Sequence, residues 1–395
     1  MEADMIIASG PYISGHFANT ITRNKWRLVD VGGMVELGLV NGAEFIKPEN
    51  ACLEIRARPE SRILTNGENA LGWVGEQLAG TPVAKAAQLF KDKAAFRRLL
   101  QPAFPELLFN ELSLEDLQNH MPAPGSYPFV VKPSVGFFSI GVHTVRSLDD
   151  WKYAKRRILK DVAGAKDHFP AHVLSQTRFL LESYIEGDEY AVDAYYDSNG
   201  EPVILNILEH RYASPDDVTD RLYTSSKQII ESLTQDAHKF LQGVNRYLGI
   251  KNFPLHAEFR RSNNGSLVPI EVNPLRFGGW CTTGDFAQYA WGVNSYEYFM
   301  NNITPDWATI FSGREDKEYS LVVLDNTTGI PRKRLGAFDY EGLLKRFSKP
   351  LHLSKIEYAG APVFGFLTVE TPRSNTEELD WVLNSDLREF ACRTG

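Results

Sequence analysis

The stretch LHAEFRRSNNGSLVPIEVNP, residues 255–274, constrains the fold more than any other part of the chain. Its centre, Asn264-Gly265, is the dipeptide that a two-residue β-hairpin turn prefers, because both turn residues need positive φ. Apolar and polar residues alternate on either side of the turn, as they do in strands with one buried face. We therefore expect an antiparallel hairpin in which Glu258 lies directly opposite Glu271.

The expected pairing gathers four polar side chains on one face of the hairpin: His256, Glu258, Glu271 and Asn273. The other face would carry Leu255, Ala257, Phe259, Val268, Ile270 and Val272. Like charges directly opposite each other, with Cβ atoms about 4.5–5.5 Å apart, destabilise a strand pair by up to about 1 kcal/mol. A divalent cation between the carboxylates reverses that effect, since Mg²⁺ takes carboxylate and phosphate oxygens as ligands. The alternative is a solvated sheet face on which both acids point into water.

Length and composition are those of a soluble globular protein. The 395 residues suit two or three packed lobes, and the apolar content of 43% and charged content of 23% are ordinary. A formal net charge of −8 argues against a general nucleic-acid binder. Cys52, Cys281 and Cys392 are too scattered for a disulfide framework, and they indicate a reducing compartment. No signal peptide is recognisable, and no apolar stretch approaches the roughly 20 residues of a membrane helix, so we expect a cytoplasmic protein.

Four segments are expected along the chain. Residues 1–90 alternate short strand-like and helix-like runs, the pattern of a small α/β layer. Residues 91–180 predict a helix, then a strand, a glycine-containing loop, a second strand and a helix. Residues 181–310 predict strands around the amphipathic helix KQIIESLTQDAHKFLQGVNRYLG. Residues 311–395 contain the strand candidates YSLVVLDN and VFGFLTVET and a helical tail.

Phosphate binding is suggested by VVKPSVGFFSIGV, residues 130–142. A buried-looking strand ends at Lys132, and the loop that follows contains Gly136 and Gly141. Glycines allow backbone N–H groups to close over phosphate oxygens. The loop lacks the Gly-Lys-Ser/Thr of a P-loop, and the alternative is a β-turn beside a surface lysine. Three more charged residues, each of which could be an ordinary solvated charge, are Lys93, Glu182 and Glu189.

The order of these segments resembles that of the ATP-grasp superfamily. The series is DK at a helix start, then VVKPSVGFFSIGV, ESYIEGDEYAVDA, HAEF and IEVNP, an order similar to that of D-alanine–D-alanine ligase and biotin carboxylase. The resemblance covers roughly residues 85–300. It implies a mixed α/β (α+β) ATP-grasp fold with a small N-terminal α/β domain (1–90), two grasp lobes (91–180 and 181–310) and a C-terminal extension (311–395). That extension matches no named subfamily.

The resemblance also implies a site for ATP and Mg²⁺ or Mn²⁺. Residues that would contact the ATP phosphates are Lys93, Lys132, Ser134, Gly136, Ser139 and Gly141. Glu182, with the backbone of Tyr184 and Ile185, would meet the adenine, and Glu189 would hold the ribose. Glu258, Glu271 and Asn273 would bind the metal ions that bridge the phosphates. A metal between Glu258 and Glu271 would explain why the hairpin tolerates facing carboxylates.

The reaction implied by the resemblance joins a carboxylic acid to an amine. An acylphosphate forms from ATP, and ADP and phosphate are released. Arg276, His256 and Arg211 are the candidates for catalysis on the acceptor side, because an arginine fork suits a carboxylate. Amino acids or related small metabolites are the expected substrates, and a homodimer remains open. The alternatives are a carboxylase or a small-molecule kinase of the same fold, or a non-catalytic nucleotide-binding protein.

Three features depart from the pattern of the superfamily. The phosphate loop carries Phe137 and Phe138 where many relatives have glycine or serine, so we expect this loop to become ordered when a nucleotide binds. His256 stands where the D-alanine ligases have arginine. Leu275 is inserted between Asn273-Pro274 and Arg276, where many relatives have arginine directly after the proline. The last two departures concern the acceptor side of the site.

Overall fold

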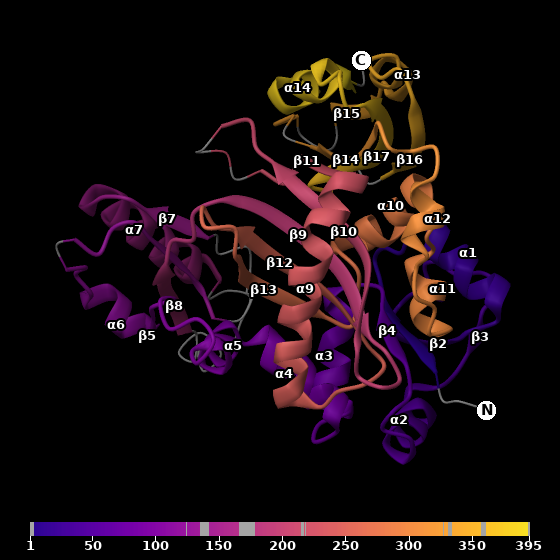
Figure 1. Cartoon of the computed structure of the whole chain (residues 1–395), viewed down its shortest axis with the longest axis horizontal. Helices are drawn as coiled ribbons and strands as arrows, with labels where there is room; N and C mark the ends of the chain where they lie inside the picture. Colours follow the sequence, from indigo (N-terminus) through magenta and orange to yellow (C-terminus); the bar gives the residue numbers. More distant parts are fainter. Residues whose placement is uncertain are drawn as a thin grey trace.

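The computed structural model describes residues 4–123, 125–134, 142–165, 178–214, 217, 219–326, 328–330, 334–356 and 361–393. Three large sheets and a two-stranded sheet, with helices packed against them, form this part of the chain (Figure 1). The mixed α/β class expected from the sequence is therefore confirmed. None of the helices in these residues is long and apolar enough to cross a membrane.

The N-terminal sheet has the strand order β3-β2-β1-β4, and its pairs are parallel. Its strands are β1 (Met5–Ser9), β2 (Arg27–Gly32), β3 (Glu44–Phe45) and β4 (Ile63–Thr65). The helices that accompany it are α1 (Gly15–Asn24), α2 (Pro48–Ala57) and α3 (Glu68–Gln77). The central strand β1 is an almost uninterrupted apolar run, because a parallel strand with neighbours on both sides is buried on both faces.

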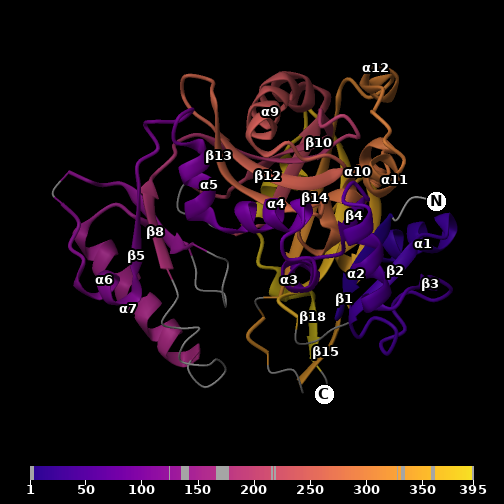
Figure 2. The ribbon, with the colours of Figure 1, turned by 90° about the horizontal axis from the view of Figure 1, so that it is seen from below.

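The second sheet belongs to a small lobe with the antiparallel order β5-β8-β6-β7. Its strands are β5 (Phe109–Ser113), β6 (Phe129–Pro133), β7 (His143–Val145) and β8 (Arg178–Ser183). The helices of this region are α4 (Pro82–Lys91), α5 (Lys93–Leu100), α6 (Leu114–Asn119) and α7 (Leu148–Ala165). Figure 2 shows this lobe to one side of the large sheet, with α5 between them. This lobe contains β6, the strand at whose end Lys132 was expected.

The third sheet has eight strands in the order β13-β12-β9-β10-β11-β14-β17-β16. These strands are β9 (Asp188–Tyr196), β10 (Pro202–Arg211), β11 (Leu222–Ser226), β12 (Phe253–Arg261), β13 (Leu267–Pro274), β14 (Lys317–Asp325), β16 (Pro350–Lys355) and β17 (Val363–Pro372). The amphipathic helix α9 (Lys227–Leu248) packs against this sheet through the apolar face expected from its sequence.

The remaining elements follow the hairpin of β12 and β13. They are η1 (Gly279–Cys281), α10 (Thr282–Trp291), α11 (Ser295–Met300), α12 (Trp307–Phe311), β15 (Leu335–Phe338), α13 (Tyr340–Leu344), α14 (Glu377–Asn384), η3 (Leu387–Phe390) and β18 (Ala391–Arg393). Strands β14, β16 and β17 continue the large sheet. The C-terminal segment is thus continuous with the sheet that carries the hairpin, and its strands can contribute walls to the site.

The hairpin of β12 and β13 has the predicted pairing but a different turn. Glu258 is the partner of Glu271. However, the N–H of Ser262 donates to the carbonyl of Ser266 over 3.0 Å, so the loop holds three residues and not two. Gly265 takes the positive φ of 85° that such a loop requires at its last position. The predicted two-residue turn is therefore wrong.

A β-bulge restores the register between this turn and the acids. Phe259 pairs with Pro269, and the register shifts between Glu258 and Phe259. Proline has no N–H to give to the ladder, which makes its neighbourhood a natural place for the irregularity. The bulge also changes the face of Ile270, which was expected to join the apolar core but lines the same cavity as Glu271.

A buried carboxyl group joins the N-terminal sheet region to the large sheet region. The hydroxyl groups of Ser14, at the start of α1, and Tyr296, in α11, donate to Asp285 Oδ1 of α10 over 2.9 and 2.7 Å. Burial raises the pKa of Asp285 from 3.8 to about 7, although both hydrogen bonds act in the opposite direction. The folded protein therefore holds a proton here that the unfolded chain releases near pH 4.

We expect Asp285→Asn to flatten the pH dependence of stability. In the wild type this group should lower the free energy of unfolding by about 1.4 kcal/mol per pH unit as the pH rises from about 4 to 7. Asparagine cannot ionise, and its amide oxygen can still accept from Ser14 and Tyr296. Urea unfolding of both proteins at pH 5, 6, 7 and 8 measures the difference. Parallel stability curves would contradict a raised pKa at Asp285.

Candidate active site

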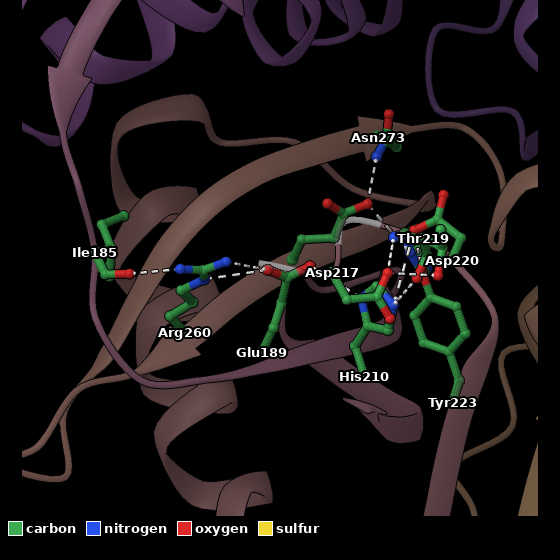
Figure 3. A network of polar contacts seen from close by, with 11 residues as sticks. Ile185, Glu189, His210, Asp217, Thr219, Asp220, Tyr223, Arg260 and Asn273 are labelled. Atoms are coloured by element: carbon green, nitrogen blue, oxygen red, sulfur yellow. Dashed lines mark hydrogen bonds and ion pairs between the residues drawn. The ribbon is translucent and has the colours of Figure 1, made fainter. Parts of the chain in front are cut away.

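The hairpin of β12 and β13 presents two carboxylates and an amide at one point of the large sheet. Asn273 Nδ2 lies 3.1 Å from Glu271 Oε1 and 3.4 Å from Glu258 Oε1. Lys93, the first residue of α5, places its Nζ 2.8 Å from Glu271 Oε2. The convergence of Glu258, Glu271 and Asn273 that the sequence predicted is therefore present in the structure. Asn273 also appears at the edge of the polar network in Figure 3.

The two facing acids differ in their electrostatic surroundings. Burial, the facing Glu271 and the nearby Glu189 raise the pKa of Glu258 well above its usual value. Burial would also raise the pKa of Glu271, but Lys93 and Lys132 lower it to about 2. Glu258 is thus an acid whose charged form has too few cations around it. A divalent cation at this position would supply the missing positive charge.

The donor set fits a hard divalent cation such as Mg²⁺. The described residues contain no group of three or more His, Cys, Asp or Glu side chains that could hold a metal by themselves. A metal here would therefore need other ligands as well. Two carboxylates and the amide oxygen of Asn273, after rotation of its side-chain amide, would leave positions for phosphate oxygens and water. Mg²⁺ sites that also bind nucleotide phosphates have this incomplete protein ligand set. The metal assignment to Glu258, Glu271 and Asn273 stays a prediction.

Lys132 lies in a buried group of three charged residues. Its Nζ is 2.5 Å from Glu182 Oε1, and Arg97 Nε is 2.7 Å from Glu182 Oε2. The three side chains are only 3–7% exposed. Burial would raise the pKa of Glu182, but Lys132 and Arg97 keep it below its usual value. The carboxylate of Glu182 thus holds these two cations, and its expected contact with the adenine stays a prediction.

A cavity of about 480 Å³ opens between the small lobe and the large sheet. Lys132 and Glu182 lie on its small-lobe side, and Glu258 and Glu271 lie on its other side. Tyr184 and Ile185, the expected adenine contacts, line it as well. Ser134 is buried at the end of β6, where its carbonyl accepts from the N–H of Lys93. Three expected phosphate contacts lie outside the described residues: Gly136, Ser139 and Gly141. Phe137 and Phe138 also lie outside the described residues.

Glu189 belongs to a polar network along one side of this cavity (Figure 3). Arg260 donates to Glu189 Oε2 from Nε and Nη2 over 3.1 and 3.0 Å, and to the carbonyl of Ile185 from Nη1 over 2.8 Å. His210 Nδ1 lies 3.3 Å from Glu189 Oε1, and its Nε2 lies 3.1 Å from the carbonyl of Thr219. Glu189 therefore lines the cavity in an orientation held by a guanidinium and an imidazole, and its contact with the ribose stays a prediction.

Two residues of this site were missed in the sequence although a signal for each was present. Arg97 follows Lys93 by four residues on α5, so both side chains lie on the same helix face. Arg260 follows Glu258 by two residues on β12, so both lie on the same face of the strand. Periodicity applied to the cations, and not only to the apolar residues, would have found both.

A second cavity of about 670 Å³ lies beyond the metal ligands. It shares four acidic residues with the nucleotide cavity: Glu189, Asp220, Glu258 and Glu271. His256, Asn273 and Arg276 also line it. Arg276 borders a third cavity, of about 260 Å³, which reaches the N-terminal domain. Its Nε lies 3.7 Å from Glu68 Oε2, which is too far for a hydrogen bond. Arg276 thus lines the same cavity as Glu258, Glu271 and Asn273, and its role toward an acceptor stays a prediction.

His256 is held by a buried acid that the sequence analysis did not single out. Its Nδ1 lies 2.7 Å from Oδ1 of Asp193, whose side chain is fully buried on β9. Its Nε2 lies 3.7 Å from Glu258 Oε1. Asp193 therefore orients the ring so that Nε2 faces the metal ligands. His256 reaches the site as expected, although its catalytic role stays a prediction.

Arg211 lines none of the three cavities that the described residues form, so the structure gives its expected catalytic role no support. Its Nη2 lies 3.1 Å from Glu318 of β14, and it lines none of the three cavities in the described part of the chain. The neighbouring His210 points to Glu189. Successive side chains of a strand point to opposite faces, so only one of these two residues could face the nucleotide cavity.

Comparisons with known proteins agree with this geometry. The sequence model of the ATP-grasp domain matches residues 125–284. No curated protein matches the chain by sequence. Among solved structures, the chain is similar to L-amino acid ligase from Bacillus licheniformis, with a TM-score of 0.68, 18% identity, and coverage of 99% of this chain and 98% of that one.

Two further solved structures have the same fold. The N5-carboxyaminoimidazole ribonucleotide synthetase from Thermotoga maritima has a TM-score of 0.63 and 14% identity, and the match covers 100% of this chain and 99% of that one. The biotin carboxylase from Campylobacter jejuni has a TM-score of 0.59 and 13% identity, and the match covers 93% of this chain and 87% of that one. The resemblance stated from the motif order is thereby confirmed: residues 125–284 form an ATP-grasp domain, and the chain as a whole has the ATP-grasp fold.

Proposed function

We propose that this chain is an ATP-dependent ligase that joins a carboxylic acid to an amine through an acylphosphate and releases ADP and phosphate. One observation carries the proposal. The carboxylates of Glu258 and Glu271 line both the nucleotide cavity and the second cavity, which also contains Arg276. A phosphoryl group bound at these carboxylates would therefore be accessible from the second cavity, where an acid substrate can be held.

The residues of the chain have separable tasks in this reaction. Lys132 and Lys93 bring positive charge to the phosphates, and Glu189 orients the nucleotide. Arg276 would hold the carboxylate of the acid against the γ-phosphorus, because a guanidinium can pair with a carboxylate through two hydrogen bonds. When bound, Mg²⁺ neutralises phosphate charge. Positioning and charge neutralisation of this kind account for most catalysis of phosphoryl transfer.

The finer properties belong to the same proposal. Glu258, Glu271 and Asn273 would take either Mg²⁺ or Mn²⁺. The acid and amine would be amino acids or related small metabolites. The three cysteines, all free thiols, support a cytoplasmic location. A homodimer remains open. A carboxylase would use bicarbonate as its acid, and a kinase would leave the phosphoryl group on its product.

An isotope experiment tests the acylphosphate. The acid substrate is labelled with ¹⁸O in its carboxylate and supplied with ATP, Mg²⁺ and the amine, and the released phosphate is weighed by mass spectrometry. We expect one ¹⁸O atom per phosphate, because the carboxylate oxygen that attacks the γ-phosphorus leaves with the phosphate when the amine displaces it. ADP should be the other product.

The other outcomes separate the alternatives. AMP and pyrophosphate as products, with the ¹⁸O in AMP, would indicate adenylation, and ADP without free phosphate would indicate a kinase. Phosphate release that needs only bicarbonate would indicate a carboxylase. Each of these results would rule out the reaction proposed above. Reaction without ATP serves as the control for exchange of the label with water.

A further inference from the structure

We propose that the acid substrate of this site carries an apolar side chain, and that Trp280 is the surface on which that side chain packs. The inference rests on the proposed ligase function and deepens it. It concerns the part of the second cavity that lies beyond the metal ligands, where the C-terminal strands form the wall.

The far wall of the second cavity is mainly apolar. Leu321 and Val323 are two positions apart, so they lie on the same face of β14, and Phe366 of β17 pairs with Val323. All three line the cavity, together with Val363. These residues come from the segment that matched no subfamily by sequence. A carboxylate held at Arg276 and the metal would therefore have an apolar surface beyond it, along which the rest of the molecule can lie.

Trp280 is the exposed part of this surface. It is 37% exposed and borders both cavities that Arg276 also lines, the second and the third. Its ring centroid lies 6.2 Å from that of Phe366 and 5.2 Å from that of Tyr12 in the N-terminal domain. Three rings from distant segments thus form one aromatic collar, Tyr12, Trp280 and Phe366.

The backbone conformation of Trp280 supports the inference that its exposed ring binds a ligand. Its φ is +54° and that of Cys281 is +60°, a region that large side chains rarely adopt. Such strain persists where the surrounding structure imposes it, and it concentrates at ligand sites. An exposed tryptophan in a strained turn, four residues after Arg276, gives a substrate a large apolar contact that only a bound molecule would cover.

The charged groups of the far wall already have partners. Arg221 pairs with Asp325, with Nη2 and Oδ1 2.7 Å apart, and donates to the carbonyls of Val382 and Ser385. Asp220 accepts from Tyr223 over 2.9 Å and its side chain is 77% exposed, so it stays solvated. An acidic side chain on the substrate would find no free cation on this wall among the described residues, and burying it without one is costly.

The test measures acid preference with hydroxylamine as a common nucleophile. Hydroxylamine attacks an acylphosphate, forms a hydroxamate and releases phosphate, so the unknown amine is not needed. Full-length protein with ATP and Mg²⁺ is offered L-leucine, L-phenylalanine, L-aspartate, L-lysine or glycine. We expect kcat/KM for hydroxamate formation to be at least about tenfold higher with leucine or phenylalanine than with aspartate or lysine.

Variants of Trp280 identify the surface responsible. Trp280→Asn keeps a residue that tolerates positive φ but removes the ring, and it should lower kcat/KM for leucine by about 10- to 100-fold while changing glycine by less than about threefold. Trp280→Phe should retain the preference. Tyr247→Asn, on the exposed side of α9, removes an exposed aromatic ring elsewhere and should leave both values unchanged. Thermal unfolding of each variant verifies that it is folded.

Each outcome has one meaning. Preference for aspartate or lysine, with hydroxamate formed, overturns the apolar substrate and leaves the ligase function standing. An equal loss for leucine and glycine in folded Trp280→Asn overturns the role of Trp280 in selection. Hydroxamate from none of a wide set of acids, with bound ATP intact, overturns the proposed function and with it this inference.

Discussion

Replacing Glu271 by glutamine is expected to lower ATP turnover by about two to three orders of magnitude. The change keeps the shape of the side chain but removes one of the two negative charges that would hold the metal. Loss of a single preorganised electrostatic contact to a transition state costs about 10²–10³-fold in other enzymes. Steady-state ADP release, measured over a range of Mg²⁺ concentrations, checks the size of the effect.

The stability of the Glu271→Gln protein should change little. The substitution removes the repulsion between Glu271 and Glu258, which raises the pKa of Glu258. It also removes the ion pair between Glu271 and Lys93, whose charged atoms are 2.8 Å apart. The two effects oppose each other, so we expect the free energy of unfolding to change by less than about 1 kcal/mol. Urea unfolding without metal measures it.

Glu318→Gln is the matched control for this prediction. Glu318 also lies on a strand of the large sheet and also pairs with a cation, Arg211, but it lines none of the three cavities around the site. Its replacement should leave turnover within about twofold. Normal turnover in Glu271→Gln, or an equal loss in the two variants, would remove the argument for a metal at Glu271.

The predicted pairing of Glu258 with Glu271 is correct because two deviations from the expected hairpin cancel. The Asn264-Gly265 signal identified a hairpin, but the loop has three residues, which alone would have moved the acids out of register. The bulge beside Pro269 restores the pairing of Glu258 with Glu271. Turn residues and strand alternation are local features, so the sequence predicted a hairpin and its two faces. The length of the loop depends on how both strands pack, and the sequence did not predict it.

The partners of the site residues were harder to predict than the residues. Lys132, Glu182, Glu189 and Arg276 were identified from motif order, and all four line the cavities. Contacts between Arg97 and Glu182 join a helix to a strand far away in sequence, and no local pattern encodes such a meeting. The same applies to the aromatic collar, which joins three segments.

The C-terminal segment shows what motif order alone leaves out. Its strand candidates in residues 311–395 were found from their apolar content, and β14 and β17 confirm them. Their role as extensions of the large sheet depends on long-range pairing of β14 with β11, which the sequence does not specify. Substrate selection, if it resides on this wall, is thus the property least accessible from the sequence.

Replacing Glu182 by glutamine is expected to destabilise the protein by about 3–5 kcal/mol. Glu182 is the carboxylate that contacts both Lys132 and Arg97, and its replacement removes the direct ion-pair partner of two buried cations. Removing one cation is less costly, because the remaining pair is balanced. We therefore expect Arg97→Met to cost less than Glu182→Gln, and both to weaken ADP binding through displacement of Lys132 from the nucleotide cavity.

Urea unfolding of the two variants tests this order, and an exposed ion pair between α5 and β5 provides the control. Arg98 lies next to Arg97 on α5 and pairs with Glu111, with side chains 56% and 29% exposed. Because solvent screens such a pair, Glu111→Gln should change the free energy of unfolding by less than about 1 kcal/mol. If Arg97→Met proves more destabilising than Glu182→Gln, the buried group is held by packing around Arg97, and charge balance does not determine its stability.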